Sequence, residues 1–236
     1  MLMNGGATMA HTMCRVSSVM AIVAMTACLT WSARAETISG RVRPMDGDTF
    51  EIAGVVIRLA DVDAPEMSQQ CQGGPKELRN CGAFVADVLA ERIRGQVVEC
   101  EVQAVDDYER RLASCSHAGE DLSTWLVSEG LALAFRRFSE RLVPEENAAR
   151  AAGRGLWQTT FETPWDHRAQ RWEAAVQEAP QGCPIKGNIS KDGKKIYHTP
   201  WGSQWYERTK ITESQGERWF CDEAEALAAG WRAPLR

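Results

Sequence analysis

The first half of the chain alternates apolar and polar positions, which predicts short β-strands because successive side chains of a strand point to opposite faces. Turn residues separate the runs: Ala53-Gly54 falls between two of them, and Asp107-Tyr108 falls between two others. The pattern predicts strands at residues 37–43, 49–52, 55–59, 96–105 and 110–117.

Between and after these strands the periodicity becomes helical. Apolar side chains recur on one face from residue 82 to 94, and Asp121 is a suitable N-cap for a second helix. A third helix is predicted from Pro144 to Gly155, with acidic residues in its first turn and arginines in its last. Five strands with about three helices inserted late favour an α+β protein built on a small barrel over a doubly wound sheet.

The composition changes after Trp157 and indicates a second part of the chain. Residues 159–182 are polar and hold two prolines, so we interpret them as a linker with one short helix-like piece at 171–177. Residues 183–236 are dense in Gly, Trp and Tyr and include a helical stretch at 222–229. They predict a small mixed C-terminal domain, after a first domain at 36–158.

The first 35 residues have the layout of a secretory signal peptide. Arg15 precedes an apolar run over 19–29, and the small residues of Ala33-Arg34-Ala35 stand just before Glu36. A membrane anchor is the rival interpretation, but the run is short for a transmembrane helix. We therefore expect an exported protein, periplasmic or secreted, with a signal peptide at 1–35 and no transmembrane span in the mature chain.

The net charge limits the kind of nucleic-acid contact that the protein can make. At −5 it argues against a broad basic surface of the kind that wraps duplex DNA. It leaves a local phosphate site open, because a few arginines in one cleft are enough.

Export makes the cysteine pattern interpretable. Of eight cysteines, Cys14 and Cys28 fall in the expected leader, which leaves six, an even number in an oxidising compartment. A metal site is the alternative, but the sequence has no C-x₂-C pair and only four His. Two of the cysteines are expected opposite each other on adjacent strands, two bracket a Gly-Gly-Pro loop, and two remain for the C-terminal segment. The expected disulfides are Cys100–Cys115, Cys71–Cys81 and Cys183–Cys221.

Two acidic segments are predicted to meet at one end of the barrel. Asp46-Gly47-Asp48-Thr49 alone is typical of a turn, and Arg58 with the acidic residues after it could be solvated strand-edge residues. The hairpin between them, however, folds Asp48 toward Arg58, and the chain beyond brings Asp63 and Glu66 to the same mouth. Converging carboxylates repel one another unless a cation lies between them, and hard oxygen ligands favour Ca²⁺ or Mg²⁺. An arginine beside such a metal is a usual partner for phosphate.

Four motifs occur in a fixed order along the chain, and together they point to a known family. With them, the chain resembles the staphylococcal nuclease, or thermonuclease, family over roughly residues 38–158. The resemblance implies a five-stranded OB-fold-like barrel that uses Ca²⁺ to hydrolyse phosphodiester bonds of DNA or RNA, with 3′-phosphate products. The motifs are DGDT at 46–49, R-x₄-D-x-P-E at 58–66, D-x-Y-x-R-x-L-A at 106–113, and the segment 145–157.

The resemblance also implies a role for each matching residue. Glu66 matches the candidate general base, which orients or deprotonates the attacking water. Arg58 and Arg110 match the two arginines that grip the phosphate and neutralise the charge of its transition state. The implied metal ligands are the carboxylates of Asp48 and Asp63 and the backbone carbonyl of Ala64.

The chain departs from the family pattern at several positions. Glu109 replaces the glycine usual before Arg110, where its carboxylate could restrain that arginine or weaken phosphate affinity. Ala64 replaces a threonine, which matters little if only the carbonyl binds metal. Phe135 and Arg137 replace tyrosines. Arginines at 136, 137 and 141 supply positive charge there, which suits a groove that tracks a nucleic-acid backbone, or else forms a solvated charge run.

The C-terminal segment resembles a small accessory domain, sometimes called a sunset domain, that follows nuclease and other exported bacterial domains. A tether or a substrate-recruiting module fits it best. Trp201 or Trp205 could stack on bases or sugars, or could fill a core. His198 beside the last two cysteines could be a partial metal site, but it lacks an evident fourth ligand. The matching pieces are 183–189, 196–200, 216–221 and 229–232.

Together these observations predict an exported, Ca²⁺-dependent nuclease acting on DNA or RNA as a monomer, with no stable protein partner. The alternative is a catalytically weak or inactive module of the same fold that binds nucleic acid or the cell envelope. Every expected catalytic position is present, which favours the enzyme. An inactive relative would be expected to lose Glu66 or an arginine, since these support a transition state rather than the fold.

Overall fold

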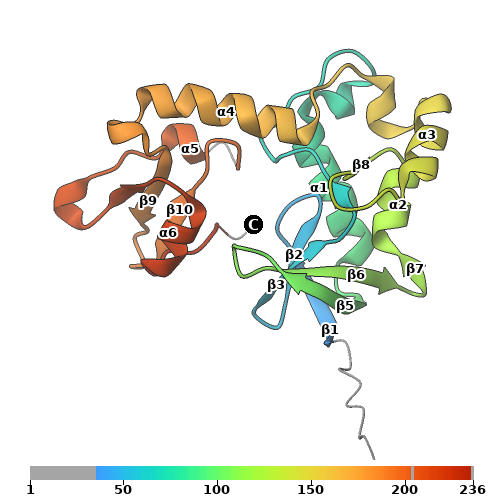
Figure 1. Cartoon of the computed structure of the whole chain (residues 1–236), viewed down its shortest axis with the longest axis horizontal. Coiled ribbons are helices and arrows are strands. Elements are labelled where there is room, and N and C mark those ends of the chain that lie inside the picture. The colour runs from blue at the N-terminus through green and yellow to red at the C-terminus, as the bar shows by residue number, and fades with distance from the viewer. Residues whose placement is uncertain (1–35, 203–204, 235–236) are drawn as a thin grey trace, which may run out of the picture. The chain divides into compact units, whose positions relative to one another are not determined.

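The computed structural model describes residues 36–202 and 205–234; the expected signal peptide at 1–35 lies outside them. The first part is an α+β structure built on a closed five-stranded barrel, as predicted (Figure 1). Neighbouring strands pair antiparallel except β3 and β6, whose parallel pairing closes the barrel. The barrel strands are β1 (Thr37–Pro44), β2 (Thr49–Ile52), β3 (Val55–Leu59), β5 (Val97–Val105) and β6 (Arg111–His117).

Strand register explains why residues distant in sequence meet at one end of the barrel. Thr49 on β2 pairs with Arg58 on β3, and Arg58 lies opposite Leu112 on β6. Two short strands, β4 (Val62–Asp63) and β8 (Leu133–Ala134), pair with each other beyond β3. The β1–β2 turn, β3, β4 and the start of β6 therefore share one mouth. A two-residue strand, β7 (Glu120–Asp121), extends the sheet beside β6.

Three helices, α1 (Cys81–Ile93), α2 (Leu122–Ser128) and α3 (Val143–Ala151), pack with the barrel around one core and lie above the strands in Figure 1. The Asp121 carboxylate caps α2 by accepting the N–H of Thr124 at 2.7 Å. The third helix ends before the expected Gly155, because Gly153 takes a left-handed φ of 59° just beyond its last turn. The largest fully buried core side chains include Phe50, Ile57, Leu59, Leu89, Ile93, Leu122 and Leu126.

Helix α4 (Pro164–Glu178) occupies most of the segment that the sequence pattern suggests is a linker. Thr163 caps it by accepting the N–H of Asp166 at 3.3 Å, and Pro164 stands at its first position. Trp165 packs against the barrel core, whereas Trp172 packs against the C-terminal core. The helix is thus longer than the piece expected at 171–177. Short 3₁₀ turns stand at Lys76–Asn80, Gly155–Gln158, Pro180–Gly182 and Glu213–Gln215.

The C-terminal region is a small mixed structure with its own core. Its three strands run in the order β10-β9-β11, all antiparallel. Ile185, Tyr197, Phe220 and Trp231 are buried together. Gly187 is required there, because a Cβ would lie 2.4 Å from Phe220 and 2.8 Å from Trp231. The elements are β9 (Ile185–Ile189), β10 (Lys195–His198), α5 (Trp205–Arg208), β11 (Arg218–Phe220) and α6 (Glu223–Ala228).

The cysteines form the three expected disulfides. The strand pair β5–β6 places Cys100 directly opposite Cys115, as the predicted register required. The remaining bonds close the loop before α1 and join the two ends of the C-terminal sheet region. The bonds are Cys71–Cys81, Cys100–Cys115 and Cys183–Cys221. Among the described residues, no helix combines the length and the apolar character that crossing a membrane requires.

Candidate active site

Asp48 stands in the tight turn between β1 and β2, where Gly47 lets the chain pass close to its neighbours. A Cβ at Gly47 would lie 2.8 Å from Ala64 Cβ and 2.9 Å from Val85 Cγ1. The Asp48 side chain is almost fully buried, and both of its oxygens have partners. Oδ1 accepts from Thr49 Oγ1 at 2.9 Å, and Oδ2 accepts the N–H of Ala64 at 3.0 Å. The DGDT turn and the segment after β4 are therefore bonded to each other.

Arg58 joins the two acidic segments, as the hairpin predicts. Its guanidinium donates to Asp48 Oδ1 at 3.0 Å and to Asp63 Oδ1 at 2.8 Å. Asp63 is fully buried, on β4, where it pairs with Leu133 of β8. Because a buried carboxylate requires a paired charge, Arg58 holds both acids in one orientation.

Glu66 follows β4 in a loop held by backbone contacts. Its N–H donates to Gln69 Oε1 at 3.2 Å, and the Gln69 side chain, 1% exposed, also donates to the carbonyl of Glu162 at 2.7 Å. Gly82, at the start of α1, fits against the same loop. A Cβ there would stand 1.6 Å from the Glu66 carbonyl oxygen. The position of Glu66 therefore depends on a close approach that only glycine allows.

Arg110 reaches the site from the β5–β6 turn. Its Nε donates to Asp106 Oδ2 at 2.7 Å, and its guanidinium lies 5.0 Å from the centre of the Tyr108 ring. Glu109 has a left-handed φ of 61°, which accounts for the glycine usual at this position in the family. Arg110 therefore lies on a restrained turn with Asp106 as its carboxylate partner, and it acts on the mouth through its charge, which helps to lower the pKa of Asp48.

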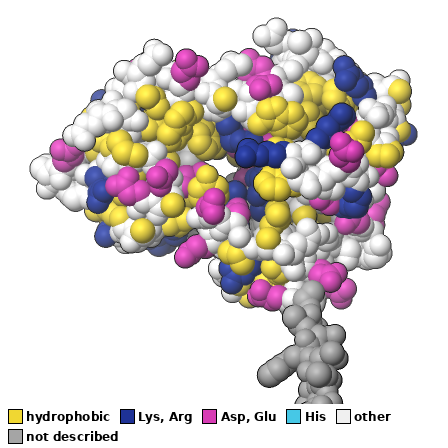
Figure 2. Space-filling model, in the orientation of Figure 1, with side chains coloured by type: hydrophobic (Ala, Val, Ile, Leu, Met, Phe, Trp, Pro, Cys, Tyr) yellow, Lys and Arg dark blue, Asp and Glu magenta, His cyan; other side chains and the backbone are white. Residues whose placement is uncertain are grey.

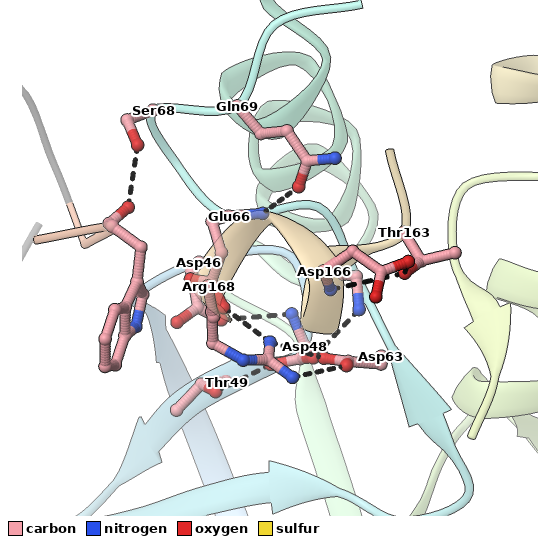
Figure 3. Close-up of polar contacts among 12 residues, drawn as sticks. Asp46, Asp48, Thr49, Asp63, Glu66, Ser68, Gln69, Thr163, Asp166 and Arg168 are labelled. Carbon is pink, nitrogen blue, oxygen red and sulfur yellow. Dashed lines mark hydrogen bonds and ion pairs between the residues drawn. The ribbon is translucent and has the colours of Figure 1, made fainter. Parts of the chain in front are cut away.

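Arg168 is a member of the site that sequence reasoning missed. It projects from α4 into the carboxylates, between Asp63 and Glu66 (Figure 3). Its two terminal nitrogens reach Asp63 at 3.0 and 2.6 Å, and Nη1 reaches Glu66 Oε1 at 2.6 Å. The only local signal is the Thr163-Pro164 helix start, which places Arg168 in the second turn of a helix. Asp46, Gln69 and Asp106 were also missed as supporting residues, although two of them lie inside the quoted motifs.

The carboxylates of the mouth differ in their protonation. Burial, followed by the Asp48 charge, raises the pKa of Asp46 to about 7. Burial also raises the pKa of Glu66, to about 8, against the opposing charge of Arg168. Burial would raise the pKa of Asp48 as well, but Arg58 and the hydrogen bonds from Ala64 and Thr49 outweigh it and lower that pKa. The mouth therefore gathers more carboxyl groups than it can readily keep ionised without cations.

This donor set fits a hard divalent cation such as Ca²⁺ in its chemistry. It consists of carboxylate and carbonyl oxygens, without sulfur or imidazole. Within 36–202 and 205–234, however, no three His, Cys, Asp or Glu side chains stand ready as a metal site. Both oxygens of Asp63 face guanidinium groups, and one oxygen of Asp48 does. Metal binding would therefore need a local rearrangement of these ion pairs.

A groove of about 1140 Å³ lies beside the site and combines rings with positive charge. Figure 2 shows dark-blue basic and yellow hydrophobic side chains next to one another in the upper right of this face. Of the arginines expected there, Arg136 and Arg137 line the groove, whereas Arg141 instead pairs with Asp61 at 2.9 Å. The lining includes the aromatic residues Phe135, Trp157, Phe161 and Trp165 and the arginines Arg136, Arg137, Arg150 and Arg168.

The C-terminal residues considered for function have structural partners. His198 Nε2 lies 2.9 Å from Asn188 Oδ1, and the two cysteines once grouped with it form a disulfide. The Trp201 ring packs against Trp172, with ring centres 5.8 Å apart. Trp205 is 54% exposed, with the Arg208 guanidinium over its ring. Trp201 therefore packs, and a metal site at His198 has no support.

Comparison with protein families agrees with the fold of the barrel and matches two segments of the chain. Residues 56–159 match the family described as staphylococcal nuclease homologue. Residues 168–233 match a second family, described as ArfC. The second match begins at Arg168, inside α4, and covers the C-terminal core.

Curated relatives match about half of this chain. Succinoglycan biosynthesis protein ExoI of Rhizobium meliloti is 34% identical over 126 residues, 52% of this chain and 66% of the relative. An uncharacterized endonuclease of Haemophilus influenzae is 30% identical, over 49% of this chain and 64% of the relative. Micrococcal nuclease of Shigella flexneri is 28% identical, over 58% and 81%. The chain thus spans just under two thirds of the lengths of the first two.

Proposed function

We propose that this protein is an exported, Ca²⁺-dependent nuclease that hydrolyses phosphodiester bonds of DNA or RNA and leaves 3′-phosphate ends. The observation that carries the proposal is the meeting of Arg58, Asp48, Asp63 and Glu66 at one barrel mouth, joined by ion pairs and hydrogen bonds. Two of the matched relatives are named as nucleases. The third is named for succinoglycan biosynthesis, so the relatives do not share one named role.

Each residue has a role that its surroundings support. Arg58 and Arg110 bind the phosphate and neutralise the charge that grows on its oxygens. Glu66, in its ionised form, accepts a proton from the attacking water and orients it. Asp48, Asp63 and the Ala64 carbonyl would hold Ca²⁺, which when bound would supply positive charge at the phosphoryl oxygens.

The groove beside the site supports a nucleic-acid substrate. Aromatic rings offer stacking surfaces for bases, and arginines offer charge for the backbone, a combination typical of single-strand binding. Such a local basic surface is compatible with the net charge of −5. A strand lying in this groove would pass Arg168 on its way to the scissile phosphate.

We also propose how the chain is divided into domains and that it is exported. Residues 1–35 act as a signal peptide, 36–158 as the nuclease domain, 159–182 as a connecting segment and 183–236 as an accessory domain. Three disulfides support an oxidising compartment, periplasmic or extracellular. The accessory domain acts as a tether or recruits substrate, and the protein works as a monomer.

The test uses residues 36–236 with oxidised disulfides. Single-stranded DNA and RNA are incubated with the protein in millimolar Ca²⁺ and in EGTA, beside the Arg110→Ala variant. Cleavage should require Ca²⁺ and should fall strongly in the variant. The product ends should resist extension by a polymerase until a phosphatase removes their 3′-phosphate.

Folded, Ca²⁺-loaded protein that cuts neither substrate would contradict the nuclease proposal. Retained binding of single-stranded DNA would then favour the alternative, a binding module of the same fold. In that case Glu109 and Arg168 are the two positions to change first, because both add charge to the site that the family motif lacks.

A further inference from the structure

Arg168 makes three hydrogen bonds to carboxylates of the candidate site. Its guanidinium grips Asp63 with two nitrogens, at 3.0 and 2.6 Å, and reaches Glu66 at 2.6 Å. Asp63 is fully buried and the Arg168 side chain is 23% exposed. A planar fork opposite a carboxylate is the strongest geometry that an arginine offers, so this contact is well formed.

On helix α4, Arg168 lies between two residues with different partners, and Trp165 is the one that ties the helix to the barrel. Trp165, three residues earlier, packs on the barrel core, and its ring centre lies 5.9 Å from that of Phe135. Arg171, three residues later, donates to the carbonyl of Pro200 at 3.1 Å. Residues three apart share a helix face, so Trp165 anchors the face from which Arg168 extends.

Arg168 and a metal ion require the same oxygens. Asp63 is an expected metal ligand and Glu66 the expected base, and Arg168 contacts the carboxylates of both. Asp63 Oδ1 also accepts a hydrogen bond from Arg58, so both Asp63 oxygens are bonded to guanidinium groups. A divalent cation at Asp63 would also lie close to the Arg168 charge, and like charges at that distance repel strongly away from bulk water.

We propose that Arg168 is an internal competitor for the metal ion: its guanidinium occupies Asp63 and Glu66 until it is displaced, and it thereby sets the affinity of the site for Ca²⁺. The inference rests on the proposed function for the identity of the metal ligands. Arg168 lies outside the matched nuclease segment of 56–159, so this control would be a property added by the following helix.

The expected size follows from population arithmetic. If Arg168 is in place in about nine molecules of ten, the measured Ca²⁺ affinity is about tenfold weaker than that of the open site. Removing the guanidinium should recover that factor. It should also leave Asp63 with Arg58 as its remaining guanidinium partner and remove the ion pair of Glu66 in the metal-free protein, which lowers its melting temperature.

The test measures Ca²⁺ binding to residues 36–236 by calorimetry, without substrate, for wild type, Arg168→Gln and Arg168→Lys. Arg171→Gln is the matched control, since Arg171 lies on the same helix and bonds Pro200 and Glu207 instead of the site. We expect about tenfold tighter Ca²⁺ binding in Arg168→Gln. Arg168→Lys, which keeps the charge but loses the fork, should fall between, and Arg171→Gln should match wild type. The melting temperature should rise more on adding Ca²⁺ in Arg168→Gln than in wild type.

Unchanged or weaker Ca²⁺ affinity in Arg168→Gln overturns the proposal and assigns Arg168 to substrate binding or to fixing α4. Absence of Ca²⁺ binding in all variants overturns it together with the metal site. Cleavage assays on the same samples separate the two proposals. Tighter Ca²⁺ binding without any cleavage contradicts the nuclease function and supports Arg168 as the competitor. Cleavage with unchanged Ca²⁺ affinity supports the nuclease function and contradicts Arg168 as the competitor. If Arg168→Gln fails to fold, the Arg168→Lys affinity decides.

Discussion

The barrel mouth and the C-terminal core both bury polar groups, but they satisfy them in different ways. In the C-terminal region the half-buried Glu223 and the buried Glu217 meet neutral donors. Tyr197 donates its hydroxyl to Glu223 at 2.8 Å, and Glu217 accepts two backbone N–H groups, those of Ile189 and Thr212. At the mouth, by contrast, several carboxylates share arginines, and two of them have pKa values raised to about 7 and 8.

The backbone differs between the two regions in the same sense. Around the mouth, Asp61 and Glu109 hold left-handed φ angles of 67° and 61°. Among the described residues of 183–234, the left-handed positions are the glycines Gly193, Gly216 and Gly230. Side-chain residues in that conformation cost about 1–2 kcal/mol each, whereas glycine adopts it freely. Charge repulsion that stability does not require therefore concentrates at the mouth, as expected for a functional site. Left-handed side-chain residues also stand in other turns of the barrel, at Ala53 and Ala118.

The largest effect is expected at the candidate base. Glu66→Gln keeps the shape of the side chain but removes the proton acceptor, so cleavage turnover should fall by roughly 10²–10⁴-fold with a smaller change in substrate affinity. Glu77→Gln, in the 3₁₀ turn that follows, is the control and should leave turnover unchanged. Steady-state kinetics on single-stranded DNA decide it. Full activity in Glu66→Gln would mean that another group is the base.

The next effect separates the two regions. Changing both Cys183 and Cys221 to Ser opens a loop with a sequence separation of 38 residues. It should cost the C-terminal region about 4 kcal/mol by the loop-entropy estimate, while cleavage by the barrel persists. Calorimetry should show an earlier, separate transition. The same change at Cys100 and Cys115 should instead destabilise the barrel and lower activity. A parallel loss of activity in both variants would show that the regions unfold as one unit.

Gly82→Ala tests the close approach at the mouth. The new Cβ would meet the Glu66 carbonyl oxygen, so it should cost about 1–3 kcal/mol, and it should lower turnover by moving Glu66. The control is Gly193→Ala, at an exposed turn with no atom within 4 Å of the new Cβ. It should lower stability only by the cost of placing alanine in a left-handed backbone conformation, and it should leave activity unchanged. Chemical denaturation with parallel kinetics distinguishes them, and equal effects on turnover would argue against a positioning role for Gly82.

Glu109→Gly relieves strain on the turn that carries Arg110. The gain from the left-handed φ is partly offset by the greater entropy of an unfolded glycine, so stability should rise by about 0.5–1 kcal/mol. Loss of the carboxylate should also tighten phosphate binding. Ala118→Gly, at a left-handed φ of 52° in another turn, should give the stability gain alone. Thermal melting and phosphate titration test both. Weaker phosphate binding in Glu109→Gly would assign a supporting role to the carboxylate.

The smallest effect concerns the C-terminal core and pH. Burial, followed by the Lys186 charge, lowers the pKa of His198 below its ordinary value of 6.5. The unfolded chain then binds more protons than the folded one below pH 6.5, so stability should fall as pH drops below that value. His198→Asn should flatten this dependence in melts followed across the window. An unchanged slope would assign it to other groups, with His167 the next to test.

The fold and most of the site follow from local patterns. A short hairpin brings Arg58 to Asp48 over ten residues, and the alternating strands set the register of Cys100 and Cys115. Arg168 could not be predicted in the same way, because it reaches Asp63 across 105 residues. That contact depends on how α4 docks, and the packing of Trp165 decides it rather than any local pattern. Pattern reasoning therefore finds the barrel and its motif residues, and misses the cation supplied from the next helix.

The Cys71–Cys81 bond bears on how the protein matures. Cys71 follows Glu66 by five residues in the chain, and Cys81 is the first residue of α1, next to Gly82. Until this bond forms, the segment that aligns the candidate base has one fewer tie to the body of the protein. A newly made chain in a reducing cell interior would lack this tie, and it would lack the Cys100–Cys115 bond of the barrel as well. Competence to cut would follow oxidation, which gives a cell that makes such an enzyme protection for its own nucleic acids.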